Sequence, residues 1–183
     1  NKMLMPFMGV PLIQRVFNRT KMVAKEVLIV SNDPEELSFM DVDLVRDSIV
    51  GQGAIGGLYT AMDRASGELV AVVAGDLPFA SPAILSEGVR LLNETGADVA
   101  IPRIKGDFYE PLHAVYRREP CKEAILEAIE AGQRRLVSWL TAVRVVEMDA
   151  ALCKRLDPDG LAFFNINNKE DFLLAEKIAG GET

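Results

Sequence analysis

Short apolar runs alternate with segments of helical periodicity along nearly the whole chain. Residues 69–74 (Leu-Val-Ala-Val-Val-Ala) form the clearest run, and residues 26–31 form a second, β-branched one. A continuous apolar run of this length is typical of a strand buried on both faces. Further strands are expected at 42–45, 97–101, 113–117, 143–148 and 163–166, and helices at 11–24, 32–36, 58–65, 81–93, 120–131, 134–142 and 169–179.

This alternation restricts the fold class. Strands separated by helices predict parallel strands joined by crossover connections. We therefore expect an α/β protein with three layers (α/β/α) around a doubly wound, mostly parallel sheet. Because no internal repeat, low-complexity tract or linker interrupts the pattern, residues 1–183 are expected to form a single domain.

The charge balance and the cysteines narrow the range of partners. A formal net charge of −7 argues against broad nucleic-acid binding, which needs a basic face. The negative charge does not exclude a nucleotide ligand, because backbone N–H groups, a few cations and a metal can bind its phosphates. The apolar runs are too short to span a membrane. Cys121 and Cys153 have no metal-ligand spacing and are expected to be reduced thiols in a cytoplasmic protein.

Asp76 has the sequence position best suited to chemistry. It follows the apolar run at 69–74, in the segment Gly-Asp-Leu-Pro at 75–78. An acid in that place lies at the carboxyl end of a strand, where α/β proteins bind ligands. Magnesium in such sites takes one or two carboxylates and leaves its other positions to phosphates and water. A turn aspartate before Pro78 fits the same pattern, so position alone leaves both interpretations open.

A glycine-rich segment, Gly-Gln-Gly-Ala-Ile-Gly-Gly at 51–57, could bring backbone close to a ligand. It is not a Walker A loop, because no Gly-Lys-Ser/Thr follows, and by itself a tight turn is the simpler explanation. Asp47 follows the strand expected at 42–45 and is either a site residue or a surface loop aspartate. We expect Asp47, Gly53 and Asp76 to surround one crevice at the carboxyl ends of strands.

Several other polar residues are weaker candidates. Lys2 could contact a phosphate, although a lysine near a chain end is usually solvated. His113 is expected to be a hydrogen-bonded core residue rather than a base. Glu110 precedes the strand expected at 113–117, and Arg134 and Arg135 could bind an anion or simply be exposed.

Read together, these segments resemble the molybdenum cofactor guanylyltransferase family, also described as molybdopterin-guanine dinucleotide biosynthesis protein A. The match runs in order over nearly the whole chain. It comprises Asn1-Lys2, 6–13 (Pro-Phe-Met-Gly-Val-Pro-Leu-Ile), 29–32 (Ile-Val-Ser-Asn), Asp47, 53–59 (Gly-Ala-Ile-Gly-Gly-Leu-Tyr), 74–79 (Ala-Gly-Asp-Leu-Pro-Phe), 110–112 (Glu-Pro-Leu), 132–135 (Gly-Gln-Arg-Arg) and 164–167 (Phe-Asn-Ile-Asn).

The resemblance implies a Rossmann-like fold of the nucleotide-diphospho-sugar transferase type, and a reaction. The terminal phosphate of molybdenum-bearing molybdopterin would attack the α-phosphate of GTP and release pyrophosphate. Asp76 would hold Mg²⁺ and Lys2 would neutralise the triphosphate, while Asp47 and Asn32 would contact the guanosine half. The pterin half would be bordered by Glu110, Arg134, Arg135, Asn165 and Asn167. Other proteins of cofactor biosynthesis or molybdoenzyme maturation are further expected partners.

The chain departs from the family pattern at two places. Asn1 and Lys2 resemble the last two residues of the family's opening signature, with Asn where Asp is usual. A strand and a glycine-rich nucleotide loop are therefore expected to precede Asn1, since the sheet would otherwise expose an apolar edge. Ala54 stands where the family usually has proline, which mainly stiffens the loop.

Two alternative functions remain open at this point. A cytidylyltransferase acting on molybdopterin, or another small-phosphate nucleotidyltransferase of the same fold, differs mainly in the base that it reads. A non-catalytic nucleotide-binding subunit or a receiver-like regulatory domain belongs to another class. A receiver also places an aspartate after a central strand, but the Glu-Pro-Leu and Asn-Ile-Asn segments do not fit one.

Overall fold

A computed structural model describes residues 1–181 of the chain. Its larger sheet contains β5 (Leu69–Val73), β8 (His113–Arg117) and β6 (Val99–Lys105) in that order, with β9 (Val145–Asp149) and the short β7 (Phe108–Tyr109) also paired to β6. β8 is antiparallel to both β5 and β6, whereas β9 is parallel to β6. It follows that β5, β6 and β9 share one direction and that β8 is reversed among them.

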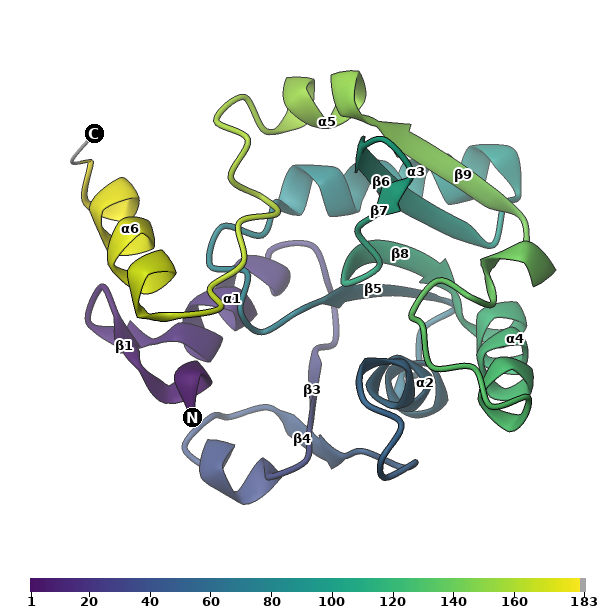
Figure 1. Cartoon of the computed structure of the whole chain (residues 1–183), viewed down its shortest axis with the longest axis horizontal. Coiled ribbons are helices and arrows are strands. Elements are labelled where there is room, and N and C mark those ends of the chain that lie inside the picture. Colours follow the sequence, from purple (N-terminus) through teal and green to yellow (C-terminus); the bar gives the residue numbers. More distant parts are fainter. Residues whose placement is uncertain (182–183) are drawn as a thin grey trace.

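A second sheet of two parallel strands lies apart from the larger one (Figure 1). It pairs β3 (Leu28–Ser31) with β4 (Asp43–Arg46), so that Leu28 lies opposite Asp43. A small antiparallel hairpin near the start of the chain pairs β1 (Pro6–Phe7) with β2 (Val10–Pro11). Asp47 therefore follows the second sheet and Asp76 the first.

Helices form the outer layers on the two faces of the larger sheet (Figure 1). α2 (Ala54–Arg64) and α4 (Arg118–Glu130) pack on one face, and α3 (Pro82–Thr95) and α5 (Ala150–Leu156) on the other. The remaining helices are α1 (Leu12–Thr20), α6 (Lys169–Gly180) and the 3-10 segments η1 (Lys2–Leu4), η2 (Pro34–Leu37) and η3 (Leu140–Ala142). This is the expected α/β architecture.

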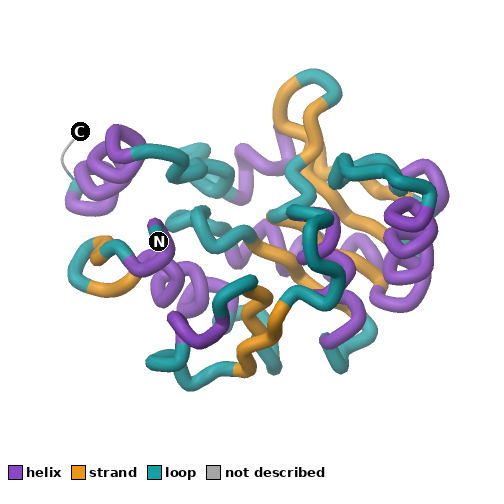
Figure 2. Tube along the Cα trace, turned by 60° about the horizontal axis from the view of Figure 1, so that its bottom comes forward, coloured by secondary structure: helices purple, strands orange, loops and turns teal. Residues whose placement is uncertain are grey.

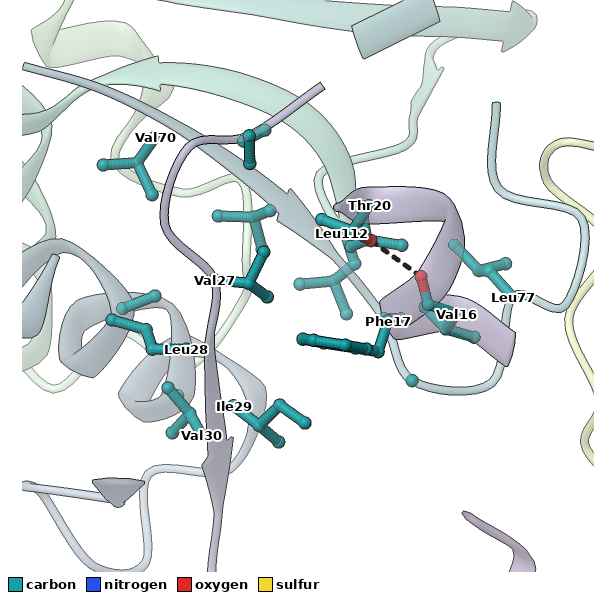
Figure 3. A pocket seen from close by; sticks show the side chains of 18 of the residues that line it. Val16, Phe17, Thr20, Val27, Leu28, Ile29, Val30, Val70, Leu77 and Leu112 are labelled. Atoms are coloured by element: carbon teal, nitrogen blue, oxygen red, sulfur yellow. Dashed lines mark hydrogen bonds between the residues drawn. The ribbon is translucent and has the colours of Figure 1, made fainter. Parts of the chain in front are cut away.

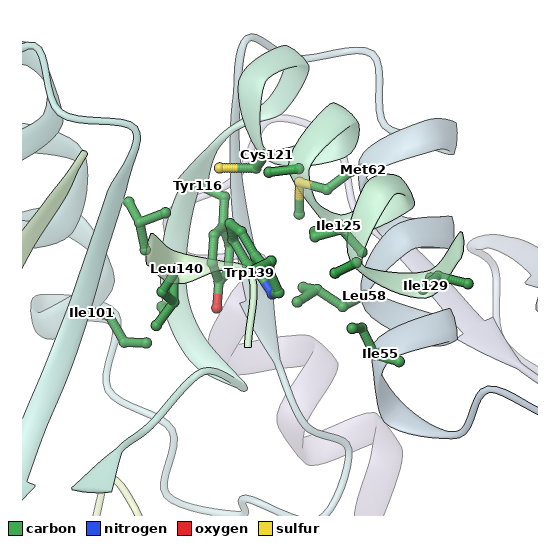
Figure 4. Packing of buried hydrophobic residues seen from close by; sticks show 14 residues of the cluster. Ile55, Leu58, Met62, Ile101, Tyr116, Cys121, Ile125, Ile129, Trp139 and Leu140 are labelled. Carbon is green, nitrogen blue, oxygen red and sulfur yellow. The ribbon is translucent and has the colours of Figure 1, made fainter. Parts of the chain in front are cut away.

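Alternating side chains of β8 divide the core into two clusters. Tyr116 is fully buried and faces α2 and α4, where its ring centroid lies 5.8 Å from that of Trp139 (Figure 4). Its neighbour Val115 points to the opposite face, against α3 and α5. Burial on both faces explains why 114–116 in β8 and 99–102 in β6 are continuous apolar runs rather than alternating ones.

A third cluster joins the two ends of the chain. The ring of Phe7 in β1 lies 5.6 Å from that of Phe172 in α6 and 6.2 Å from that of Phe79. Figures 1 and 2 show α6 beside the N-terminal hairpin from two directions. α6 begins with a capping box between Asn168 and Asp171, which fixes its first turn.

Two expected elements are wrong. Residues 163–166 were expected to be a strand but are irregular, because the N–H of Ile166 donates to the carbonyl of Asp76 rather than to a ladder. Residues 134–142 were expected to be a helix but contain only η3. α5 was not expected, although Asp149 caps it by accepting from the N–H of Leu152. Among residues 1–181, no helix combines the length and apolar character that a membrane crossing requires.

Candidate active site

Asp76 lies in the turn that follows β5, and Lys2 reaches it from η1. Its Oδ2 accepts a hydrogen bond from Lys2 Nζ at 2.8 Å, and the same ammonium donates to the carbonyl of Ile166 at 2.8 Å. The N–H of Ile166 in turn donates to the carbonyl of Asp76 at 3.0 Å. Three segments far apart in sequence are therefore bound together at the carboxyl end of β5.

The second carboxylate oxygen of Asp76 bears on metal binding. Oδ1 is buried and has no hydrogen-bond partner among the described residues. A buried carboxylate oxygen without a donor is costly, and a cation would compensate for it. Among the described residues no group of three or more metal-ligating side chains surrounds it. Magnesium sites in proteins often use one or two carboxylates and draw their other ligands from phosphates and water.

Two residues expected on the pterin side, Glu110 and Asn165, line the same cleft as Asp76. Burial raises the pKa of the Glu110 carboxyl above its usual value. Asn167 is exposed, and its backbone N–H donates to Asp171 at 2.9 Å. Asn165 and Asn167 thus belong to the segment that carries the Ile166 carbonyl, but only Asn165 lines the cleft.

Asp47 is held against the start of α2. Its Oδ1 accepts from Thr60 Oγ1 at 2.8 Å and from the N–H of Ile49 at 3.2 Å. A Cβ on Gly56 would come within 3.2 Å of Asp47 Oδ2, so glycine allows this close approach. Thr60, which is fully buried, was not identified from sequence, although a threonine on the apolar face of a helix is a signal that could have found it.

The glycine-rich loop leads directly into α2. Gly53 is the N-cap with φ +61°, and Gly51 has φ +83°, so both adopt backbone conformations that favour glycine. Arg134 Nη1 donates to the carbonyl of Gly51 at 3.2 Å, which brings the Arg134 loop to the start of α2. Ala54, the first residue of α2, lines the cleft together with Asp76.

Asn32 and Arg135 lie outside these contacts. Asn32 is exposed after β3, and its carbonyl accepts a hydrogen bond from Arg46. Arg135 is exposed, and its backbone carbonyl accepts a hydrogen bond from Ser138 Oγ at 2.9 Å. The structure therefore pairs Lys2 with Asp76 and places Glu110 and Asn165 on the lining of the cleft that Asp76 also lines. Asp47 and Arg134 contact α2 and the loop that leads into it.

A cleft of about 1070 Å³ separates β3 from β5. It runs from Glu26 and Ser66, at the amino ends of the two strands, to Ser31 and Asp76 at their carboxyl ends. Figure 3 shows Leu28, Ile29 and Val30 of β3, Val70 of β5 and Phe17 of α1 around it. Every residue of β3 and β5 is only half-buried, although both strands are apolar runs.

His113, at the start of β8, supports the segment that follows Asp76. Its Nε2 accepts a hydrogen bond from the N–H of Ser81 at 2.8 Å, and its ring packs 5.3 Å from that of Phe163. Burial lowers the pKa of His113 from 6.5 to about 4. The imidazole is therefore a neutral, hydrogen-bonded core residue, as expected.

This lowered pKa predicts an acid-sensitive contribution to stability. Because the folded state binds the His113 proton more weakly than the unfolded state, the contribution is fully present above pH 6.5 and is lost as pH falls toward 4. Its size is on the order of 3 kcal/mol. Urea unfolding at several pH values should show a steeper acid loss for the parent than for His113→Gln, which keeps an acceptor but cannot titrate. Equal pH slopes for the two proteins would contradict the prediction.

Comparison with known families matches residues 1–145 to the MobA-like NTP transferase domain. The chain is 32% identical to a probable molybdenum cofactor guanylyltransferase of Natronomonas pharaonis, over 82% of this chain and 77% of that protein. It is 30% identical to a molybdenum cofactor guanylyltransferase of Desulfosudis oleivorans, over 96% of this chain and 86% of that protein.

Solved structures give the same picture. Molybdopterin-guanine dinucleotide biosynthesis protein A from Archaeoglobus fulgidus superposes with a TM-score of 0.85 at 26% identity, covering 98% of this chain and 91% of that one. 2-C-methyl-D-erythritol 4-phosphate cytidylyltransferase from Thermus thermophilus superposes with a TM-score of 0.68 at 18% identity, covering 98% and 94%. The second similarity concerns the fold alone.

Proposed function

Because the chain belongs to the family of MobA-like NTP transferase domains, it is a nucleotidyltransferase, and we propose that it acts as a molybdenum cofactor guanylyltransferase. Relatives named for that activity match 82 to 98% of the chain at about 30% identity. The observation that carries the proposal is the Asp76–Lys2 pair at the carboxyl end of β5, which supplies a carboxylate and an ammonium where α/β proteins bind ligands.

The proposed reaction joins a phosphate of molybdopterin to the α-phosphorus of GTP. A new phosphoanhydride bond forms, the bond between the α- and β-phosphates breaks, and pyrophosphate leaves with the electron pair. Since the attacking phosphate is already an anion, the site needs no strong general base. Catalysis then rests on positioning and on neutralising charge. Lys2 is suited to the second role, because its side chain is 37% exposed and its ammonium lies 2.8 Å from Asp76 Oδ2.

Asp76 is the residue proposed to hold Mg²⁺, because its Oδ1 is buried without a donor in residues 1–181. The metal would supply charge stabilisation to the transferring phosphate. Asp47 and Asn32 are proposed for the guanosine half and Glu110, Arg134, Arg135, Asn165 and Asn167 for the pterin half. Among these, Asn165 has the most direct structural support, because it adjoins Ile166, whose carbonyl binds the same Lys2 ammonium as Asp76.

A comparison of nucleotides tests the proposal. With magnesium and molybdopterin, pyrophosphate release should require GTP, and CTP should react at least tenfold more slowly, a difference of about 1.4 kcal/mol. Calorimetry with each nucleotide alone separates base recognition from chemistry. Equal or faster release with CTP would instead support the cytidylyltransferase alternative. Phosphorylation of Asp76 by acetyl phosphate, without nucleotide transfer, would support the receiver-like one.

We propose further that a β-strand preceding Asn1 fills the cleft between β3 and β5. Within residues 1–181 each of these strands pairs on one side only, β3 with β4 and β5 with β8, and its other edge borders the cleft. Met3 lines the carboxyl end of the cleft, where such a strand would join the chain. Intact-mass measurement of the protein from its natural source tests this: a mass equal to residues 1–183 would contradict it.

The two cysteines suggest the cellular compartment, and the proposed reaction names the partners. Cys121 and Cys153 are free and buried, as in a protein of a reducing compartment, and we place the enzyme in the cytoplasm. GTP and molybdenum-bearing molybdopterin are its proposed substrates. Proteins of cofactor biosynthesis or molybdoenzyme maturation are its proposed further partners.

A further inference from the structure

The turn that carries Asp76 is attached to α1 at three points. A Cβ on Gly75 would lie 3.0 Å from Ile13 Cδ1, so the helix packs directly on the end of β5. Arg15 Nε donates to the carbonyl of Pro78 at 3.0 Å. One helical turn later, Arg19 Nε donates to the carbonyl of Ala80 at 2.6 Å. No residue between Ile13 and Arg19 was a sequence candidate.

Arg15 has an environment that suits a fixed position rather than a solvated charge. The Cζ of its guanidinium lies 5.1 Å from the ring centroid of Phe7 and 5.6 Å from that of Phe79. Burial, followed by the charge of Arg19, lowers the pKa of the Arg15 guanidinium. In the described part of the chain neither arginine pairs with a carboxylate.

Such an arrangement has an energetic cost. Two like charges at i and i+4 on a helix repel each other, and partial burial removes hydration from Arg15. Bonds from a guanidinium to backbone carbonyls are the compensation that the structure provides. Both accepting carbonyls belong to the turn after Asp76, so the compensation is directed at one segment.

We infer that Arg15 is a positioning residue for Asp76, holding the carboxylate in place through the Pro78 carbonyl. This inference rests on the proposed function, in which the Asp76 carboxylate binds the metal. Pro78 has no N–H, so it cannot donate a hydrogen bond of its own. The turn also has bonds from Leu77 N to Ala74 O at 3.2 Å and from Ala80 N to Leu77 O at 3.1 Å. Both join residues of the same segment, and neither attaches Pro78 to a helix.

Three variants test the inference. Arg15→Met keeps the apolar stem between the two phenylalanine rings but removes the charge and the donor. Arg15→Lys keeps a charge without the Nε donor and serves if the methionine variant folds poorly. Arg90→Met is the matched control, because Arg90 forms its ion pairs with Glu87 and Glu94 within α3 rather than with the turn after Asp76.

Two measurements separate positioning from general destabilisation. Amide hydrogen exchange over residues 76–81 should become about tenfold faster or more in Arg15→Met, as expected for a lost charge-assisted hydrogen bond, and stay unchanged in Arg90→Met. Pyrophosphate release should fall about 10- to 100-fold, because small misplacements of a catalytic group have effects of that size. Arg15→Lys should fall between the parent and Arg15→Met in both.

A double-variant comparison gives the decisive result. If Arg15 acts through Asp76, adding Arg15→Met to Asp76→Asn should cause no further loss of transfer. An additive loss, or exchange over 76–81 that matches the parent, would overturn the inference. The exchange measurement needs no nucleotide transfer, so it separates the two proposals. If the parent transfers no guanylyl group, the proposed function is refuted. If Arg15→Met still shows faster exchange over 76–81, the positioning role stands.

Discussion

Asp76→Asn should fold like the parent and lose about a hundredfold or more of its guanylyl transfer. Asparagine keeps the volume and one carbonyl oxygen, so packing in the turn after β5 is retained. It removes the negative charge that is proposed to bind the metal and that pairs with Lys2. Thermal unfolding should change little, because partly exposed ion pairs contribute only about 0–1 kcal/mol. Pyrophosphate release with GTP, magnesium and molybdopterin measures the loss.

The matched control for Asp76→Asn is Asp149→Asn. Asp149 caps α5 by accepting from the N–H of Leu152 at 2.7 Å, and asparagine caps a helix as well as aspartate does. Its replacement should leave both rate and stability near those of the parent. If Asp76→Asn also turned over within about threefold of the parent, a barrier change under ~1 kcal/mol, Asp76 would be a turn residue without a role in the reaction.

Lys2→Met has the second largest expected effect. Methionine keeps most of the apolar stem and removes the ammonium that joins Asp76 Oδ2 to the Ile166 carbonyl. We expect transfer to fall about a hundredfold, because Lys2 is the cation closest to the proposed metal carboxylate. A rise in KM for GTP would show that Lys2 binds the triphosphate in the ground state, and a fall in kcat alone would show that it acts in the transition state.

Two further variants serve as a rescue and a control for Lys2→Met. Lys2→Arg should recover part of the rate, since it restores a cation with different geometry. Lys122→Met removes a lysine of α4 that pairs with Glu119 on the same helix and with Asp63 of α2. None of the three lines the cleft, so the rate should be unchanged. A Lys2→Met enzyme with parental kcat and KM would show that the ion pair with Asp76 is structural only.

Asp76 is the site residue whose position could be predicted from the sequence. Its place after the apolar run 69–74 located it at the carboxyl end of a strand, and β5 ends three residues before it. Lys2 was a weak candidate in sequence terms, because nothing local connects a residue at the start of the chain to position 76. Only the folded structure shows the pair, together with the backbone carbonyl of Ile166, which carries no side-chain signal.

Arg15 and Thr60 are residues that the sequence analysis did not identify. Arg15 lies on a helix whose periodicity was evident, yet a guanidinium on a helix surface is usually solvated, and its acceptor is a carbonyl 63 residues away. Thr60 lies on the buried face of α2, where its hydroxyl bonds to Asp47 across 13 residues of sequence. Hydrogen bonds of this kind depend on which distant segments the fold brings together, and the type of a single residue does not specify that.

The sequence by itself determined the α/β class, most of the strands and helices, and the family, because hydrophobic periodicity and ordered motifs are local properties. The tertiary structure alone decided that residues 163–166 are irregular and that β8 runs against β5 and β6. It also decided that Lys2, Asp76 and Ile166 meet while Asp47 is bound to α2. Strand direction, loop conformation and side-chain pairing follow from long-range packing and backbone hydrogen bonding. The local sequence does not specify them, because apolar residues of similar β propensity fit both parallel and antiparallel pairing.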